Sequence, residues 1–146
     1  MDFNYLYLSL DGRIGRQSYW IGIAGFVVIA LVVGLIIAVI AGLNTTLGLI
    51  LALIVEIVLI YPAYCLMGKR FQDRGKPASY ALIGLAVSIV IALLGVLGIT
   101  HDALGQPTAF GWICNVVQII IGVWFLVELG ILRGTVGPNE YGPDPV

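Results

Sequence analysis

The sequence predicts an all-α, polytopic membrane protein: a four-helix transmembrane bundle with a short interfacial helix at its N-terminus. Of the 146 residues, 60% are hydrophobic and only 10% are charged, whereas soluble domains carry roughly 25% charged residues. The apolar residues form four long runs, each close to the roughly 20 residues that cross a hydrocarbon core as a helix. The basic residues all fall outside these runs, as in membrane proteins with a fixed orientation.

The expected elements belong to a single transmembrane domain, residues 1–146. The first is a short amphipathic helix, because Phe3, Leu6, Tyr7 and Leu10 recur at helical spacing and tyrosines suit the headgroup level of a membrane. The alternative is a disordered terminus. A central polar loop and a tail rich in proline and glycine, which excludes a helix, complete the chain. The spans are expected at residues 19–41, 47–67, 80–100 and 112–132, the loop at 68–79 and the tail at 133–146.

The placement of the basic residues predicts the orientation. All seven Lys and Arg residues lie before the first span, in the central loop or after the fourth span. The two short loops on the other side contain neither Lys nor Arg. Because cytoplasmic loops carry the excess of basic residues, we expect both termini and the central loop to be cytoplasmic. A signal peptide does not fit, because the first apolar run is too long and three more follow.

Three motifs resemble those of a known family. Gly12, Arg13, Arg16, Tyr19 and Trp20 match the pattern GR-x-x-R-x-x-[FY]-W, while Arg70, Asp73 and Gly75 match R-R-L-H-D-x-G-x-S-G-W, with Lys69 as a like-charged substitute. The third motif is the tail, with its Gly-Pro-Asn and Tyr-Gly-Pro-Asp-Pro sequences. Together with four spans, these motifs resemble the small bacterial inner-membrane proteins known as domain of unknown function 805, over essentially the whole chain. The resemblance implies the fold and a location in the bacterial inner membrane, and it implies no activity.

The loop also departs from the family pattern at other positions. Phe71 replaces Leu, Gln72 replaces His, and Pro77 and Ala78 stand in the Ser-Gly region. Any role that rests on a titrating histidine in this loop is therefore missing from this chain.

The basic residues beside the spans form the first candidate site. One interpretation is topological: such residues fix the orientation and contact lipid phosphates nonspecifically, each contributing about 1 kcal/mol near an anionic surface. The other is a shaped site for an anionic ligand or lipid headgroup, because guanidinium groups suit phosphate. The mixture of Arg, Asp and Gly favours the second, since a generic anchor needs only Lys and Arg. The candidate residues are Arg13, Arg16, Lys69, Arg70, Asp73, Arg74 and Lys76, with Asp73 expected to orient Arg70 and Arg74.

Polar residues inside the predicted spans form the second candidate site: Glu56, Asn115, Gln118 and Glu128. An ionisable group at mid-bilayer is costly and is a functional hypothesis by default. Glu56 either forms a neutral bridge to a neighbour such as Gln118, worth about 0.6 kcal/mol on average, or belongs to a proton or cation pathway. Glu128 lies near the inner end of the fourth span, where an ion pair with Arg133 or the basic residues is expected.

The tail is expected to fold back against the basic residues. Its Gly-Pro turns favour a defined path over a flexible linker. Tyr141 is the expected anchor, with Asp144 or Glu140 as the ion partner.

These features predict a non-enzymatic membrane protein that binds membrane lipids, in particular anionic headgroups, or a partner through its basic cytoplasmic face. The alternative is a small-solute, proton or ion transporter or channel that uses Glu56, and a lipid-modifying enzyme is a third reading. A homo-oligomer is a further expectation, since small residues every four positions let another helix approach closely. These residues are Ala30, Gly34, Ala38 and Gly42. No cofactor, metal or nucleic-acid partner is expected, because no motif for one is visible.

Overall fold

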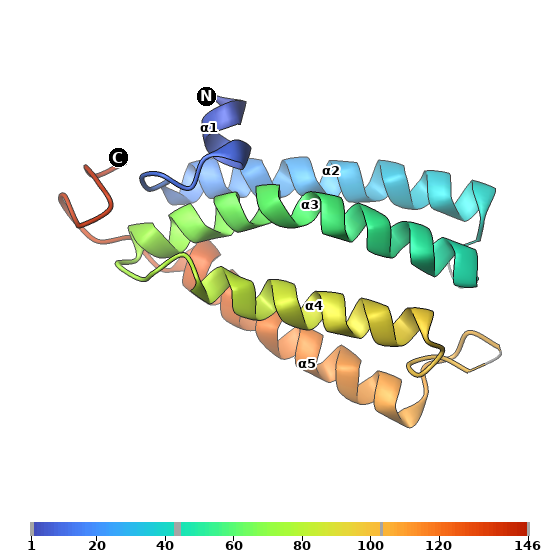
Figure 1. The fold of residues 1–146 in the computed structure, drawn as a ribbon. Helices are drawn as coiled ribbons and strands as arrows, with labels where there is room; N and C mark the ends of the chain where they lie inside the picture. The colour runs from blue at the N-terminus through green and yellow to red at the C-terminus, as the bar shows by residue number, and fades with distance from the viewer. Residues whose placement is uncertain (1, 43–44, 103, 146) are drawn as a thin grey trace.

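The chain forms long helices that lie side by side, preceded by one short helix (Figure 1). The computed structural model describes residues 2–42, 45–102 and 104–145. Parts of the two predicted short loops and the last residue of the predicted tail lie outside the described residues. The helices are α1 (Phe3–Leu8), α2 (Arg16–Ile40), α3 (Thr46–Asp73), α4 (Tyr80–Val96) and α5 (Ala109–Phe125), which continues directly as a π-helix, η1 (Leu126–Ile131). The predicted all-α fold class is confirmed.

Three helices are long and apolar enough to cross a membrane: α2, α3 and the continuous helix formed by α5 and η1. Large apolar side chains on their outer faces are exposed, for example Leu31 on α2 and Val58 on α3. Such a surface suits lipid rather than water. α4 is equally apolar but has 17 residues, a rise of about 25 Å against a hydrocarbon core of about 30 Å. The chain is therefore a helical membrane bundle, and a count of four spans stays a prediction.

Local capping explains where the helices begin and end. The hydroxyls of Thr45 and Thr108 accept hydrogen bonds of 3.0 Å from backbone N–H groups in the first turns of α3 and α5, as N-cap residues do. α3 and α4 each end with a glycine of positive φ, Gly75 at 69° and Gly98 at 73°. At both ends the backbone bonds are those of a Schellman motif. α4 therefore ends at Val96, before the end of the predicted third span, residues 80–100.

α3 continues further than predicted. It ends at Asp73 rather than at Met67, so the first half of the predicted loop 68–79 is helical and carries Lys69, Arg70 and Asp73. Charged residues favour a loop when they need water, but these three side chains are buried against partners from other elements. Because partners inside the protein satisfy these charges, the three residues remain in the helix, which ends just before Gly75.

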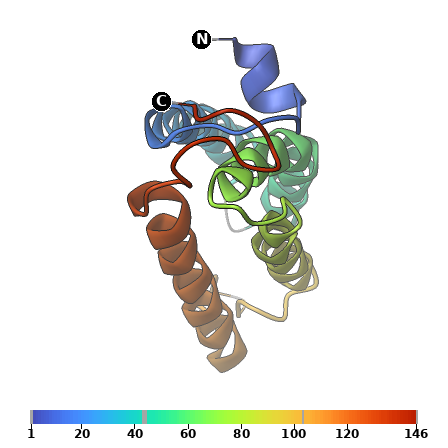
Figure 2. The same ribbon diagram turned by 90° about the vertical axis from the view of Figure 1, so that its left-hand side faces the viewer.

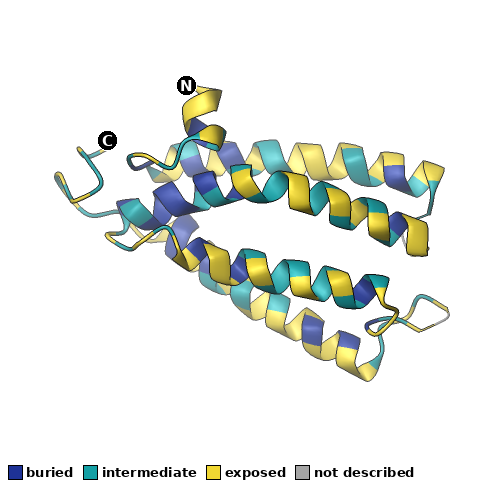
Figure 3. Cartoon of the chain, viewed as in Figure 1, coloured by how far each residue is buried: buried dark blue, intermediate teal, exposed yellow. Residues whose placement is uncertain are grey.

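The tightly packed part of the protein lies at one end of the bundle. Figure 1 shows both termini and the α3–α4 connection at this end, while the pair α2–α3 diverges from the pair α4–α5 toward the opposite end. Figure 3 shows buried residues concentrated in the same region. Its apolar core is a cluster of buried side chains: Leu6, Ile14, Tyr19, Leu66, Phe71, Ala81, Phe125 and Leu129. We call this the basic end, because it holds the seven Lys and Arg residues.

α1 is a helix, as expected, and it docks on the bundle. Leu6 is only 1% exposed, and the Tyr7 hydroxyl donates a 3.0 Å hydrogen bond to the carbonyl of Gly22 in α2. Phe3 and Leu8 remain exposed. Contacts with α2 and α3 therefore hold this helix in place.

Candidate functional site

A buried charge network connects the first two sequence motifs. Asp73 lies in the last turn of α3, and its Oδ1 accepts a 2.9 Å hydrogen bond from Nε of Arg13. Its Oδ2 is paired with Nη1 of Arg70. Arg13, Arg70 and Asp73 are 4%, 0% and 2% exposed. A buried charge is tolerated only when it is paired and hydrogen-bonded, and both oxygens of this carboxylate are used.

The same end of the bundle carries a second arrangement that the sequence did not reveal. Five consecutive backbone carbonyls, at residues 129–133, each accept a hydrogen bond from a side chain. The last carbonyls of a helix have no N–H partner within it and form the negative end of its dipole. In order of the carbonyls, the donors are Arg70, Trp20, Arg16, Arg70 again and Arg74. Side chains from the motifs on α2 and α3 thus cap the end of η1.

The tail continues this pattern by crossing the end of α3 (Figure 2). Arg13 donates from its two remaining nitrogens to the carbonyls of Thr135 and Gly137, the latter at 2.8 Å. The Thr135 N–H donates to the carbonyl of Asp73 at 2.8 Å. The side-chain amide of Asn139 donates to the carbonyl of Gln72 at 2.9 Å. The tail is therefore docked on the basic end.

The anchor of the tail differs from the predicted one. Thr135 and Asn139 make the contacts with α3, and Tyr141 makes none of them. Asp144 has the expected ionic role, because its Oδ1 lies 3.9 Å from a guanidinium nitrogen of Arg13. Gly134 is required by space: a Cβ there would overlap the Asp73 carboxylate.

Lys69 serves the docking of α1. Its ammonium group is fully buried, donates to the carbonyl of Tyr5 and lies 4.3 Å from the centre of the Tyr5 ring. Burial raises the pKa of the Tyr5 phenol, so the hydroxyl stays protonated and donates to the carbonyl of Arg13 at 3.3 Å. Gln72, where the family pattern has His, lies with its amide nitrogen 3.0 and 2.8 Å from the carbonyls of Leu10 and Gly12 when the amide is oriented as a donor.

Glu128 is paired with the basic residues, as expected, although not with Arg133. Its Oε1 lies 3.1 Å from Nε of Arg74 and 2.8 Å from Nζ of Lys76. Asp73 therefore orients Arg70 and Arg13, whereas Arg74 turns to Glu128. The six predicted basic residues are brought together at one end, but they divide into several distinct contacts.

A polar cavity of about 130 Å³ opens among these residues. Arg16 and Arg133 are its exposed cations. Arg16 donates one 3.2 Å hydrogen bond to the carbonyl of Ile131, and no hydrogen bond or ion pair from the Arg133 side chain is found within the described part of the chain. The cavity is lined by Gly15, Arg16, Arg70, Asp73, Arg133, Gly134, Thr135 and Asp144. The exposed guanidinium groups of Arg16 and Arg133 therefore lie beside this cavity.

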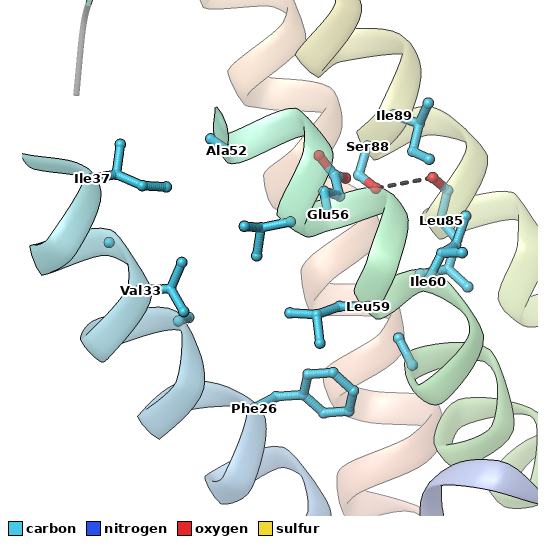
Figure 4. Close-up of a pocket in the computed structure, with 14 residues that line it drawn as sticks. Phe26, Val33, Ile37, Ala52, Glu56, Leu59, Ile60, Leu85, Ser88 and Ile89 are labelled. Carbon is cyan, nitrogen blue, oxygen red and sulfur yellow. Dashed lines mark hydrogen bonds between the residues drawn. The ribbon is translucent and has the colours of Figure 1, made fainter. Parts of the chain in front are cut away.

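Glu56 lies far from this network, between two cavities in the middle of the bundle. The larger, of about 320 Å³, is formed by α2, α3 and α4, with Ser88 as its other polar residue. Figure 4 shows the Glu56 carboxyl directed toward α4, on the side of Ser88. The smaller, of about 160 Å³, extends from Glu56 to Asn115. Gln118 lines another cavity, which shares Leu85 and Ser88 with the larger one, and no hydrogen bond joins its side chain to Glu56.

The stripe of small residues on α2 faces the larger of these cavities in part. Ala30 and Gly34 line it, and a Cβ added at Gly34 would meet no atom within 4 Å. Gly34 therefore takes part in no close helix contact among the described residues, and the homo-oligomer stays a prediction.

Packed apolar helices with an arginine-capped end define a helical membrane protein. Residues 7–143 match the family described as "Protein of unknown function (DUF805)", and the chain belongs to this family. It is similar to the "Uncharacterized protein YiiR" of Escherichia coli strain K12 and to the protein of the same name in Escherichia coli O157:H7. Each is 30% identical over 141 residues, which cover 93% of this chain and 85% of the relative. No solved structure matches the chain.

Proposed function

We propose that this protein is a non-enzymatic protein of the bacterial inner membrane that binds the headgroup of an anionic phospholipid at its basic end. The observation that supports this function is the cavity of about 130 Å³ flanked by the exposed side chains of Arg16 and Arg133. Guanidinium groups present several N–H donors in a plane that matches two oxygens of a phosphate.

The contacts of the basic residues indicate which of them can bind a ligand. Arg13, Lys69 and Arg70 are buried and donate to Asp73 or to backbone carbonyls. Lys76 and Arg74 neutralise Glu128. Arg16 uses one of the five N–H donors of its guanidinium in a hydrogen bond to the carbonyl of Ile131. Ligand binding therefore depends on Arg16 and Arg133, and the other basic residues hold the fold.

The position of these two arginines along the chain suits a headgroup. Arg16 is the first residue of α2, and Arg133 follows η1 by two positions. Both therefore stand where candidate membrane spans leave the hydrocarbon. Trp20 lies one turn into α2, is 44% exposed and donates to the carbonyl of Gly130 at 3.2 Å. Tryptophan is enriched at the membrane–water interface, which supports the same depth for the cavity.

Native mass spectrometry tests this function. Detergent-solubilised protein is mixed with phosphatidylglycerol or with phosphatidylcholine, and retained lipid is counted for wild type, Arg16→Gln, Arg133→Gln and Lys76→Gln. We expect wild type to prefer phosphatidylglycerol, and the two cavity variants to lose that lipid by about tenfold, because a hydrogen bond to a charged group is worth about 1.5 kcal/mol or more.

Lys76→Gln is the matched control, since it removes one charge from the same end without touching the cavity. It should retain the lipid. An equal loss in all three variants would show a nonspecific charge effect and would contradict the proposal, as would equal retention of both lipids by wild type. Arg133→Gln is the decisive variant, because no hydrogen bond or ion pair of the Arg133 side chain with the described residues is lost in it.

A further inference from the structure

We propose that Glu56 is the anchor of a second binding site, for a lipophilic amine, in the apolar space between α3 and α4. This site is separate from the headgroup cavity and does not depend on it. Its ligand carries one protonated nitrogen on a compact apolar body.

The space is large enough for such a molecule. The cavity of about 320 Å³ on one side of Glu56 falls within the roughly 300–1,000 Å³ typical of small-molecule sites. The cavity of about 160 Å³ on its other side shares Ala52 and Glu56 with the first. This smaller cavity reaches Thr100 and His101, beyond the end of α4. The diverging helix pairs in Figure 1 open toward this end of the bundle.

The Glu56 carboxyl has no basic partner, which favours a positively charged ligand. Asp73 and Glu128 each have two basic partners. In contrast, Glu56 forms no hydrogen bond or ion pair with any of residues 2–42, 45–102 and 104–145, and no Lys or Arg lines either of its cavities. Apart from Glu56, the titratable side chains that line these cavities are His101 and Cys114 in the smaller one, and Nδ1 of His101 lies 2.9 Å from the Thr100 hydroxyl. An intramembrane carboxyl is costly to keep without a partner, so a ligand that supplies a positive N–H donor would be favoured.

The side chains that line the cavity determine which class of cation can bind. Around Glu56 the larger cavity is lined by aliphatic side chains and Phe26, with the Ser88 hydroxyl already donating to the carbonyl of Leu85 at 2.9 Å. Mg²⁺ or Ca²⁺ needs about six oxygen ligands, which these walls do not offer, and no group of three or more His, Cys, Asp or Glu residues that could hold a metal ion is found among the described residues. An amine needs one acceptor and an apolar surface for the rest of the molecule. Its neutral form also crosses lipid to reach the site.

Binding of adamantan-1-amine to the purified full-length protein in detergent tests this inference, with adamantan-1-ol as a probe of the same shape that carries no charge. We expect wild type to bind the amine at least about tenfold more tightly than the alcohol, from the charge-assisted hydrogen bond. Glu56→Gln should abolish the preference. Glu140→Gln, which neutralises an exposed carboxyl in the tail, should keep it.

A second measurement does not depend on the fold of a variant. A hydrophobic carbodiimide should modify Glu56 in wild type, and adamantan-1-amine should protect it. Equal binding of amine and alcohol by wild type, or modification of Glu56 without protection, would overturn the proposal. So would a tightly retained lipid that excludes both probes, because the occupant would then be an acyl chain. Arg133→Gln should keep amine binding, which separates failure of this site from failure of the headgroup site.

Discussion

Nε of Arg13 lies 2.9 Å from Oδ1 of Asp73, sixty residues further along the chain. Arg13 precedes the first long helix and Asp73 ends the second, so this pair connects the entry of α2 to the exit of α3. Arg13 also donates to two carbonyls of the tail, and Asp73 also holds Arg70. One buried carboxylate thereby joins α2, α3, η1 and the tail at the basic end.

The first prediction concerns Arg70→Lys. An ammonium group cannot reproduce the planar set of donors that reaches Asp73 and the carbonyls of Leu129 and Leu132. We expect the free energy of unfolding to fall by about 3 kcal/mol, measured by denaturant titration in detergent. Arg133→Lys is the control and should change it by less than about 0.5 kcal/mol. Equal stabilities of the two variants would show that Arg70 acts only through its charge.

A second prediction follows from the space around Gly134. A methyl group there would overlap the Asp73 carboxylate, so Gly134→Ala should cost about 1–3 kcal/mol and release the tail to protease. Gly122→Ala is the comparison, because a Cβ at this helical position meets no atom within 4 Å and alanine favours a helix by about 1 kcal/mol over glycine. A tail equally resistant to protease in both variants would argue against tight docking.

The orientation gives a third prediction. Both termini lie at the basic end (Figure 1), and an excess of Lys and Arg predicts the cytoplasmic side. A reporter that is active only in the cytoplasm should be active when fused after Val146. Activity of a reporter that functions only in the periplasm, fused at the same position, would reverse this topology.

Several features of the fold could be predicted from local sequence. Apolar runs and a helical repeat predict the helices, because burial in lipid requires about 20 consecutive apolar residues. The predicted end of the second span, at Met67, is wrong, because α3 continues through Lys69 and Arg70. From sequence alone, a charged residue is expected to lie in solvent. In the structure both side chains are fully buried. Their partners are carbonyls of Tyr5 and Leu129, far away in sequence, and no local pattern encodes such pairs.

The candidate site shows the same limit. The sequence predicts the basic residues as one group and an ion pair of Glu128, since opposite charges near one membrane face attract. It does not predict which arginines are buried and which are exposed, because that depends on which side chains meet the end of η1. The glycines and prolines of the tail are the sequence feature that could indicate its docking. At Gly134 the backbone passes so close to the Asp73 carboxylate that there is no room for a side chain.

The central claim is that Arg13 and Asp73 stabilise the basic end as a pair. A double-mutant cycle with Arg13→Gln, Asp73→Asn and the combined variant tests it most directly, with unfolding followed by denaturant titration in detergent. Arg13→Gln leaves Asp73 with Arg70 as its one basic partner, and Asp73→Asn takes the buried carboxylate from Arg13 and Arg70. Each single variant should cost about 3 kcal/mol, while the double variant should cost clearly less than the sum. We predict a coupling free energy of at least about 2 kcal/mol. Additive effects, within about 0.5 kcal/mol, would contradict the claim.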